Sequence, residues 1–451
     1  MKTKVNISLN SDTAKKLKRL AETSNMNVSQ WISEKVWETA KKNEGIVTDA
    51  DIKDYQKRFM GSDNILFGTV NEAQIGLRLK DSLRNHNVFV TGAAGTGKSY
   101  SYIWSNLLLG NHSAIVADPF SCTARQRTEE LKRKGHKVYW LDFTNPEKSS
   151  RYNPFLHLND SFTEKDLSDL IYNIFVKSDE IDPFYDMINK ILLNIAVTYT
   201  SKSSKFKDED RTFETMYHVI EEMGDNRDKL KEYDIDGIFG NNCTETVFLC
   251  SEENYQKAVK MLTRLQLMPF LSLNFFKCFE EREDTDNIDI NALVNGQGYL
   301  FYGSSDYSTR WENTAVISLL TELFMQDAFA CASKRTLEHH LQFYLDEFSS
   351  YGAPNIVKYL RKNGYGIGIS VITQLQEQLE LRFGKVAEQI PKCCDTKIYM
   401  GTVLHSDVKE ISETTNLDSA VIEDIFNSGK EIVKVTDIYP FVCNKLEPLK
   451  I

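Results

Sequence analysis

One short segment has the composition and order of a loop that binds the phosphate groups of a nucleotide. Residues 92–99 read Gly-Ala-Ala-Gly-Thr-Gly-Lys-Ser, which is the pattern G-x-x-x-x-G-K-S. Glycines at such positions let the backbone wrap a phosphate chain and turn its N–H groups inward. Lys98 would reach the β- and γ-phosphates, and the Ser99 hydroxyl would bind Mg²⁺. The sequence therefore predicts ATP and Mg²⁺ as cofactors, with these nucleotide-binding residues: Gly92, Gly95, Thr96, Gly97, Lys98 and Ser99.

Two carboxylates and one amide follow other apolar runs and would complement the loop. Asp346 and Glu347 come directly after the run 342–345, and Gln374 closely follows the run 366–372. Asp346 would hold the Mg²⁺ shell, and Glu347 would polarise the attacking water. Gln374 would sense the γ-phosphate or position that water. An ordinary acidic strand end is the alternative, but the apolar run before the Asp-Glu pair favours a catalytic role.

The loop needs an element on each side to hold it. Residues 87–91 read Asn-Val-Phe-Val-Thr, a short apolar strand, and a helix-compatible stretch follows Ser99. Strand, loop and helix in this order are the context in which the motif binds phosphate, which argues against a chance glycine-rich turn. The runs before Asp346 and Gln374 would be further buried strands, so we expect an α/β fold.

Length and composition limit the kind of protein. The chain has 451 residues, 41% hydrophobic and 26% charged, with a net charge of −10. This is the profile of a folded soluble protein of two or three domains, and it excludes dominant disorder. The eight cysteines form no C-x-x-C pair, which argues against a zinc ribbon and for a reduced cytosolic compartment. The most apolar long stretch, 315–332, contains Glu322 and Asp327, so no membrane span is expected.

The first 43 residues differ in charge and pattern from the rest. They carry nine Lys or Arg and four Asp or Glu, a net charge of +5, which leaves −15 on the other residues. Residues 4–9 alternate polar and apolar, which predicts a strand. A helix is expected over 13–23, and a second helix from about Val28. Strand, helix, turn and helix within forty residues resemble the ribbon-helix-helix DNA-binding family.

This first resemblance implies a dimer, because forty residues cannot bury an adequate core alone. The two paired strands would enter the major groove, with Lys4, Asn6 and Ser8 directed toward base edges. Ser29, at the start of the second helix, would lie against a DNA phosphate. The alternative is a dimerisation hairpin with no role in DNA binding. We assign residues 1–44 to this module.

The order of motifs along the rest of the chain resembles a second family. In chain order they are the loop at 92–99, Asp118-Pro119, Arg151-Tyr152-Asn153-Pro154-Phe155, Asp346-Glu347-Phe348 with Gly352, Gln374, Gln378-Leu379 and Phe383-Gly384. From about Phe67 to the end, this order looks like that of the type IV secretion coupling proteins. These are TraG/VirD-type ATPases of conjugative DNA transfer, related to the FtsK and HerA motors.

The second resemblance implies a division into domains. Residues 65–160 and 287–451 would form a RecA-like P-loop ATPase domain, and residues 161–286 would form an inserted all-α domain. The helical spacing of apolar residues between 184 and 195 fits such an insertion. Residues 45–64 are polar and weakly periodic, so we expect a linker with a short helix.

The sequence departs from the family pattern in two places. Residues 120–122 read Phe-Ser-Cys where the family has Lys-Gly-Glu, and the basic module stands in place of transmembrane helices.

The family also implies a hexameric ring in which a neighbour's arginine completes each site. Arg361 is the best match for this fifth catalytic residue, after Lys98, Asp346, Glu347 and Gln374, with Arg127 and Arg310 as weaker candidates.

The resemblance implies an ATP-hydrolysing coupling protein that delivers relaxase-bound single-stranded DNA to a type IV secretion channel. Expected partners are single- and double-stranded DNA, the relaxase or relaxosome, and channel proteins or a small membrane recruiter. Further copies of the chain would form the hexamer and the paired ribbon-helix-helix modules. The protein would be cytoplasmic, recruited to the inner face of the membrane by a partner. The alternatives are a double-stranded DNA translocase of a mobile element and a non-enzymatic, site-specific DNA-binding regulator.

Overall fold

The structure is a computed structural model of the whole chain. It describes residues 11–23, 28, 31–32, 47, 49–80, 84–119, 124–177, 181–235, 247, 249–267, 275–281, 283–296, 298–303, 314–334, 337, 339–362, 364–402 and 404–448. The predicted first helix is present as α1 (Ser11–Thr23). The predicted strand at 4–9 lies outside the described residues.

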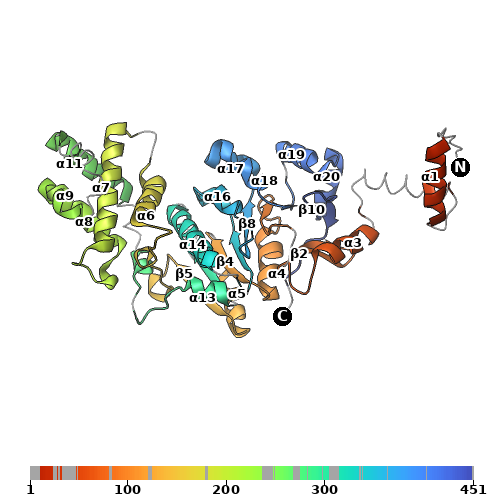
Figure 1. The fold of residues 1–451 in the computed structure, drawn as a ribbon, viewed down its shortest axis with the longest axis horizontal. Coiled ribbons are helices and arrows are strands. Elements are labelled where there is room, and N and C mark those ends of the chain that lie inside the picture. Colours follow the sequence, from red (N-terminus) through yellow and green to blue (C-terminus); the bar gives the residue numbers. More distant parts are fainter. Residues whose placement is uncertain are drawn as a thin grey trace.

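A largely parallel sheet forms the centre of the molecule (Figure 1). Among the described residues it contains nine strands, in the spatial order β5 (Lys137–Asp142), β6 (Gly298–Gly303), β4 (Ser113–Asp118), β7 (Leu341–Leu345), β8 (Ile367–Thr373), β3 (Val88–Thr91), β9 (Thr396–Tyr399), β10 (Glu431–Val435) and β11 (Phe441–Cys443). The strands from β5 to β9 run parallel, and β10 and β11 add an antiparallel edge. Parallel strands end at one edge of a sheet, where ligands bind in such folds.

Both faces of the sheet are buried, as the continuous apolar runs predict. Val88 and Val90 of β3 pack into one core, and Phe89 between them packs into the core of the opposite face. The helices that cover the sheet or follow its strands are α4 (Ser105–Leu109), α5 (Ala124–Arg133), α13 (Ile290–Asn295), α14 (Thr314–Lys334), α15 (Phe348–Tyr351), α16 (Ile356–Leu360), α17 (Gln376–Phe383), α18 (Gln389–Lys392), α19 (His405–Thr415) and α20 (Ser419–Asn427).

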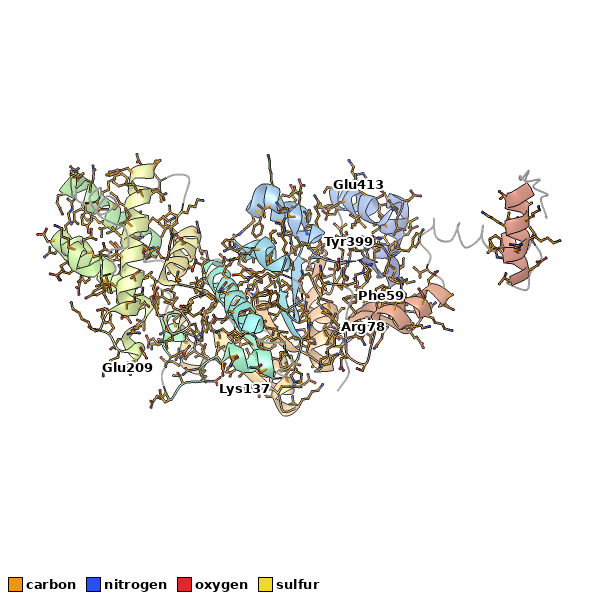
Figure 2. All side chains as sticks on the ribbon, in the orientation of Figure 1. Phe59, Arg78, Lys137, Glu209, Tyr399 and Glu413 are labelled. Atoms are coloured by element: carbon orange, nitrogen blue, oxygen red, sulfur yellow. The ribbon has the colours of Figure 1, made fainter. Side chains whose placement is uncertain are left out.

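A helical body occupies one end of the molecule, the left side of Figure 1. It consists of α6 (Glu164–Ile171), α7 (Pro183–Lys202), α8 (Phe213–Asp225), α9 (Leu230–Tyr233) and α11 (Glu252–Lys260), joined by shorter turns. The caps are local: the Thr163 and Asp166 side chains form a capping box, and Asp182 accepts from the Phe184 N–H at 2.8 Å. Figure 2 labels Glu209 in this body and Glu413 on α19 near the other end. Helices thus lie where the insertion at 161–286 was expected.

The segment 45–64 is more than a linker. It contains α3 (Asp49–Phe59), whose Ile52, Tyr55 and Phe59 are buried in the same core as the hairpin of β1 (Asn64–Val70) and β2 (Ala73–Arg78). The Tyr55 hydroxyl donates to the Gly76 carbonyl at 2.8 Å. The short helix was expected, but its packing onto the body was not. Ile52, Tyr55 and Phe59 have the spacing of one helix face, but their pattern does not show which part of the chain that face packs against.

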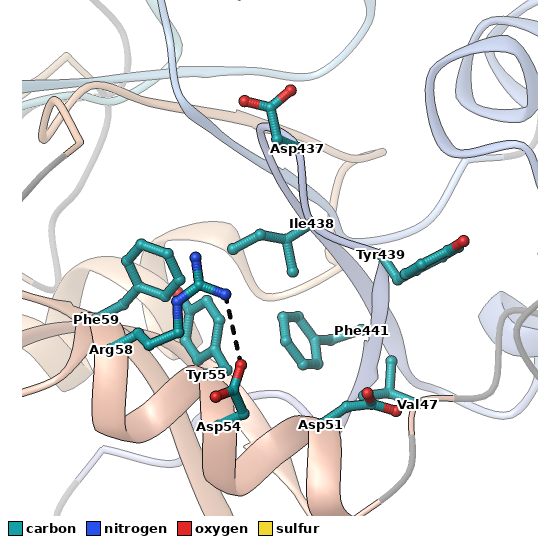
Figure 3. Close-up of a pocket in the computed structure, with 10 residues that line it drawn as sticks. All are labelled: Val47, Asp51, Asp54, Tyr55, Arg58, Phe59, Asp437, Ile438, Tyr439 and Phe441. Carbon is teal, nitrogen blue, oxygen red and sulfur yellow. Dashed lines mark hydrogen bonds and ion pairs between the residues drawn. The ribbon is translucent and has the colours of Figure 1, made fainter. Parts of the chain in front are cut away.

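A pocket of about 180 Å³ lies between α3 and the connection from β10 to β11 (Figure 3). The rings of Tyr55, Phe59 and Phe441 line it, and Arg58 forms an ion pair with Asp54 at 3.4 Å on its rim. It lies apart from the glycine-rich loop.

One helix in the described part of the chain, α14, is long and apolar enough to cross a membrane by length and composition. Most of it is buried inside the structure, and its two acidic residues have partners there. This is the environment of a core helix.

Candidate nucleotide site

The glycine-rich loop lies at the carboxyl edge of the sheet, directly after β3, as the strand predicted at 87–91 implies. It leaves β3 between β8 and β9: the Gly92 N–H donates to the Thr373 carbonyl at 3.3 Å, and the Ala93 N–H donates to the Gly401 carbonyl at 2.8 Å. The chain then enters a π-helical stretch, η1 (Lys98–Trp104), followed by α4. Strand, loop and helix therefore stand in the predicted order.

Two glycines of the loop adopt conformations that other residues rarely reach. Gly95 has a φ of 78° and Gly97 a φ of 98°. At Gly92 the restriction is space instead, because a Cβ there would lie 2.7 Å from the Thr96 Oγ1. The motif's glycines thus fix the path of the loop.

Lys98 is buried and folded onto the loop. Its Nζ donates to the Gly92 carbonyl at 2.7 Å and to the Ala93 carbonyl at 3.2 Å, and the residue is only 5% exposed. Burial lowers the pKa of Lys98, and the nearby carboxylates of Glu347 and Asp346 oppose that shift. The ammonium is thus next to the loop's interior, within reach of an anion that enters it.

Ser99 and Asp346 meet at the other side of the loop. The Ser99 hydroxyl donates to Asp346 Oδ2 at 2.5 Å, although 247 positions separate them in the chain. Burial raises the pKa of Asp346 to about 6. A hydroxyl and a carboxylate are hard oxygen ligands of the kind Mg²⁺ takes, with phosphate oxygens and water completing its shell. No group of three or more His, Cys, Asp or Glu in the described residues could hold a metal. The Ser99 hydroxyl and the Asp346 carboxylate are thus close enough together to contribute two oxygen ligands to the predicted Mg²⁺.

Glu347 and Gln374 also come together. The Gln374 amide donates to both carboxylate oxygens of Glu347, at 3.0 and 2.9 Å. Glu347 has a φ of 52°, an uncommon conformation for a residue other than glycine that is associated with functional sites. Gln374 thus contacts the predicted base, and its expected role of sensing the γ-phosphate or positioning water stays a prediction.

The remaining family motifs around the Asp-Glu pair have a packing role. Gly352 has a φ of 69°, and a Cβ there would lie 2.8 Å from the Phe383 ring. That ring stacks on Phe348, with centroids 5.4 Å apart, and Arg382 donates to the Ser350 carbonyl at 3.1 Å. These contacts dock α17 against α15, directly after Glu347.

Arg361 is not part of the same cluster. It follows α16, and the Leu360 carbonyl before it accepts from the Asn87 side chain at 2.7 Å. Asn87 precedes β3, so Arg361 lies at the amino edge of the sheet, opposite the glycine-rich loop. Its guanidinium donates to the Gln389 side chain at 2.8 Å. Any part in hydrolysis would have to be played at a neighbouring subunit's site.

Sequence reasoning missed Lys445. Its Nζ donates to the Thr96 carbonyl at 2.8 Å and to the Met400 carbonyl at 2.9 Å, so a residue near the end of the chain contacts the loop. A single lysine after a short strand gives no signal of such a contact. The predicted DNA-binding residues Lys4, Asn6, Ser8 and Ser29 lie outside the described residues, as do Arg310, residues 120–122 and the side chain of Arg127.

Sequence-family comparisons give two matches. The model described as "Type IV secretory system Conjugative DNA transfer" matches residues 30–244. The model described as "TraM recognition site of TraD and TraG" matches residues 340–417. Together they cover well over half of the chain. A search of curated proteins found no match.

Solved structures share the fold. The conjugative coupling protein TrwBΔN70 in complex with sulphate has a TM-score of 0.64 at 15% identity, covering 90% of this chain and 94% of its own. TrwB with the ATP analogue ADPNP has a TM-score of 0.63 at 16% identity, covering 90% and 94%. VirB4 of Thermoanaerobacter pseudethanolicus has a TM-score of 0.55 at 11% identity, covering 85% and 97%.

Fold and site together define a RecA-like P-loop ATPase, which confirms the predicted fold class. The matching families then make the identification specific. The chain belongs to the type IV coupling proteins, the ATPases that link conjugative DNA transfer to a type IV secretion system. The prediction of this family from the order of its motifs is confirmed. The ribbon-helix-helix prediction is not tested and stays a prediction.

Proposed function

We propose that this coupling protein hydrolyses ATP with Mg²⁺ at the 92–99 loop and uses the energy to deliver relaxase-bound single-stranded DNA to a type IV secretion channel. The observation that carries the proposal is the convergence of three separate motifs, at 92–99, 346–347 and 374, on one edge of the sheet. The similar TrwB is described in complex with ADPNP and with ADP and Mg²⁺, which supports the choice of cofactors.

Each residue of the site then has a defined task. When a nucleotide binds, the Lys98 ammonium gives up its hydrogen bonds to the Gly92 and Ala93 carbonyls and donates to oxygens of the β- and γ-phosphates. Charged phosphate oxygens are stronger acceptors for a buried cation than neutral carbonyls. Ser99 and Asp346 would hold Mg²⁺, which when bound offsets negative charge on the phosphates. Glu347 accepts a proton from the attacking water, and the Gln374 amide fixes its direction.

Assembly and DNA recognition complete the proposal. The chain would form a hexameric ring in the cytoplasm, recruited to the inner face of the membrane by a channel protein or a small membrane recruiter. The relaxase or relaxosome would supply the DNA. Residues 1–44 would pair as ribbon-helix-helix dimers and read duplex DNA near the transfer origin through Lys4, Asn6 and Ser8, with Ser29 at a phosphate.

ATPase assays of the full chain with single-stranded DNA, duplex DNA and no DNA test the motor. Stimulation by single strands or by relaxase-bound DNA would support coupling. Stimulation by duplex alone would instead favour a double-stranded DNA translocase. Turnover no higher than that of Lys98→Ala under all conditions would favour a DNA-binding regulator.

The N-terminal module is tested by competition between transfer-origin and scrambled duplexes. Asn6→Ala in the full chain should reduce discrimination, because a base-edge contact is worth about 1–3 kcal/mol. Lys18→Ala, a change away from the predicted strand, should leave discrimination intact. Equal affinity of the unchanged chain for both duplexes would contradict sequence reading.

A further inference from the structure

Lys445 lies in the segment after β11, outside every motif that the site uses. Its ammonium bridges two carbonyls, that of Thr96 inside the phosphate loop and that of Met400 directly after β9. We propose that Lys445 is a positioning residue of the nucleotide site, which holds the loop in the shape that receives the β-phosphate. This inference rests on the proposed ATPase function and adds a residue to its machinery.

The effect of Lys445 on the loop follows from the geometry of one peptide unit. The Thr96 carbonyl and the Gly97 N–H belong to the same planar, trans peptide. An ammonium that fixes the direction of this carbonyl therefore also fixes the direction of the N–H. Gly97 has a φ of 98° and, as a glycine, many accessible conformations, so an external restraint removes alternatives that the loop would otherwise sample. Hydrogen bonding at the carbonyl also polarises the peptide and strengthens its N–H as a donor.

Backbone contacts show that Lys445 ties together parts that must stay in register. The Met400 N–H donates to the Thr91 carbonyl at 2.8 Å, and the Ala93 N–H donates to the Gly401 carbonyl at 2.8 Å. The end of β9 thus runs beside the start of the loop. Lys445 adds a second connection between these two segments. Its ammonium joins the Met400 carbonyl, directly after β9, to the Thr96 carbonyl, farther along the loop.

The segment that carries Lys445 is itself anchored. The Asn444 backbone exchanges two hydrogen bonds with the Thr69 backbone of β1, at 3.0 and 2.8 Å. β11 before it pairs with β10, and Phe441 packs against Tyr55 of α3, with ring centroids 5.0 Å apart. Because its backbone is held on two sides, Lys445 can act as a fixed clamp.

A competing role for Lys445 is to neutralise Glu431. Glu431 is 1% exposed and pairs in register with Cys443, two residues before Lys445. However, neither of its carboxylate oxygens has a hydrogen-bond partner among the described residues, whereas Lys445 donates to the two carbonyls. Burial raises the pKa of Glu431, which favours its neutral form, and Lys445 opposes this shift. The hydrogen bonds therefore assign Lys445 to the loop.

The test compares nucleotide binding and turnover in full-length variants. Lys445→Met keeps the apolar stem and removes the ammonium. We expect it to raise the Kd for Mg²⁺–ADP and the KM for ATP about tenfold, as expected for loss of a charge-assisted hydrogen bond, with kcat within about twofold. Lys445→Arg should restore most of the affinity. The matched control is Lys434→Met, since Lys434 also donates to a backbone carbonyl, that of Ile438, but not in the loop.

Several results would overturn the inference. One is a Kd for Mg²⁺–ADP in Lys445→Met equal to that of Lys434→Met. Another is rescue of Lys445→Met by Glu431→Gln, because that would make Lys445 the counter-ion of Glu431. If Lys445→Met does not fold, Lys445→Gln takes its place, because its neutral amide can still donate to one carbonyl, with a smaller loss expected. Failure of the unchanged chain to bind Mg²⁺–ADP would instead contradict the proposed function.

Discussion

Two pairs of carboxyl groups in this molecule look alike chemically and have different partners; three of the four groups, Asp346, Glu322 and Asp327, are buried, and Glu347 is half-buried. Asp346 and Glu347 lie at the carboxyl edge of the sheet, whereas Glu322 and Asp327 lie within α14. Burial raises the pKa of Asp346, and it does the same for Glu322 and Asp327. A raised carboxyl pKa is therefore no sufficient mark of a catalytic group here, although such shifts cluster at active sites in general.

The partners of the two pairs differ. Glu322 accepts from the Asn355 backbone N–H at 2.6 Å and from the Asn355 side chain at 3.2 Å. Asp327 accepts from the Tyr152 hydroxyl at 2.6 Å and lies 3.3 Å from His157. These partners join other elements to α14, and none of them belongs to the glycine-rich loop.

The site carboxyls instead contact groups that a nucleotide or its metal would engage. Asp346 accepts from the loop's own Ser99, and Glu347 is held by Gln374 in a strained backbone conformation. The comparison teaches that the kind of partner, more than burial, separates the functional pair from the structural pair. It also gives the Tyr-Asn-Pro motif a structural role, because Tyr152 secures α14.

The largest expected effect is on the functional pair. Glu347→Gln keeps the size of the side chain and removes the proton acceptor, so kcat should fall about 10²- to 10⁴-fold while ATP binding is kept. Single-turnover hydrolysis and a separate nucleotide-binding titration measure the two quantities. Glu388→Gln, at an exposed carboxylate paired with Lys392, is the control and should leave kcat unchanged. Hydrolysis by Glu347→Gln at the parental rate would remove Glu347 from the mechanism.

A second prediction asks whether the functional pair is completed by a neighbouring subunit. Arg361→Ala and Lys98→Ala should each be nearly inactive alone. Mixed hexamers should regain part of the activity, since some junctions would join an intact Lys98 to an intact Arg361. ATPase rates across mixing ratios, with co-assembly verified by mass, provide the measurement. Co-assembled mixtures without any recovery would argue that Arg361 does not act in trans, and its place at the amino edge of its own sheet would then leave it no part in hydrolysis.

The sequence was sufficient to predict where its contiguous motifs lie in the fold. The loop at 92–99 and the Asp346–Glu347 pair each combine a short motif with an apolar run, and both lie at the predicted edge of the sheet. The sequence could not predict contacts between distant segments, which depend on the spatial order of the strands. Lys445 reaches Thr96 across 349 positions because β10 pairs with β9 and β11 pairs with β10, and no local pattern encodes that arrangement. The burial of α3 was missed for the same reason.

A third prediction concerns the structural pair. Tyr152→Phe removes the hydroxyl that donates to Asp327 and leaves a buried acceptor short of a partner, so the free energy of unfolding should fall by about 1–3 kcal/mol. The kcat for ATP hydrolysis, measured well below the unfolding temperature, should stay within about twofold, because Tyr152 touches no residue of the site. A loss of kcat comparable to that of Glu347→Gln, in a variant of parental stability, would break the distinction between the two pairs.

The smallest expected effect is a change in the pH dependence of stability. Burial raises the pKa of Glu322, so the folded chain holds a proton that the unfolded chain releases near its ordinary pKa. Stability from this group is complete below the unfolded pKa and is lost as the pH rises toward the folded pKa. Glu322→Gln removes that loss, so the variant's free energy of unfolding should fall less steeply above about pH 4.5, by up to about 1.4 kcal/mol per pH unit.

Denaturant titrations of the nucleotide-free chain at several pH values between about 4.5 and 7 measure this slope. Glu388→Gln serves as the control, because the Glu388 carboxylate is exposed and forms a surface ion pair with Lys392 at 3.4 Å, so the slope of this variant should match that of the unchanged chain. Asp327 and Glu431 titrate in the same direction, so the variant keeps part of the slope. Parallel curves for Glu322→Gln and the unchanged chain would mean that Glu322 stays ionised in α14. Its bonds to Asn355 would then offset its burial, and a raised pKa would no longer be a feature that Glu322 shares with Asp346.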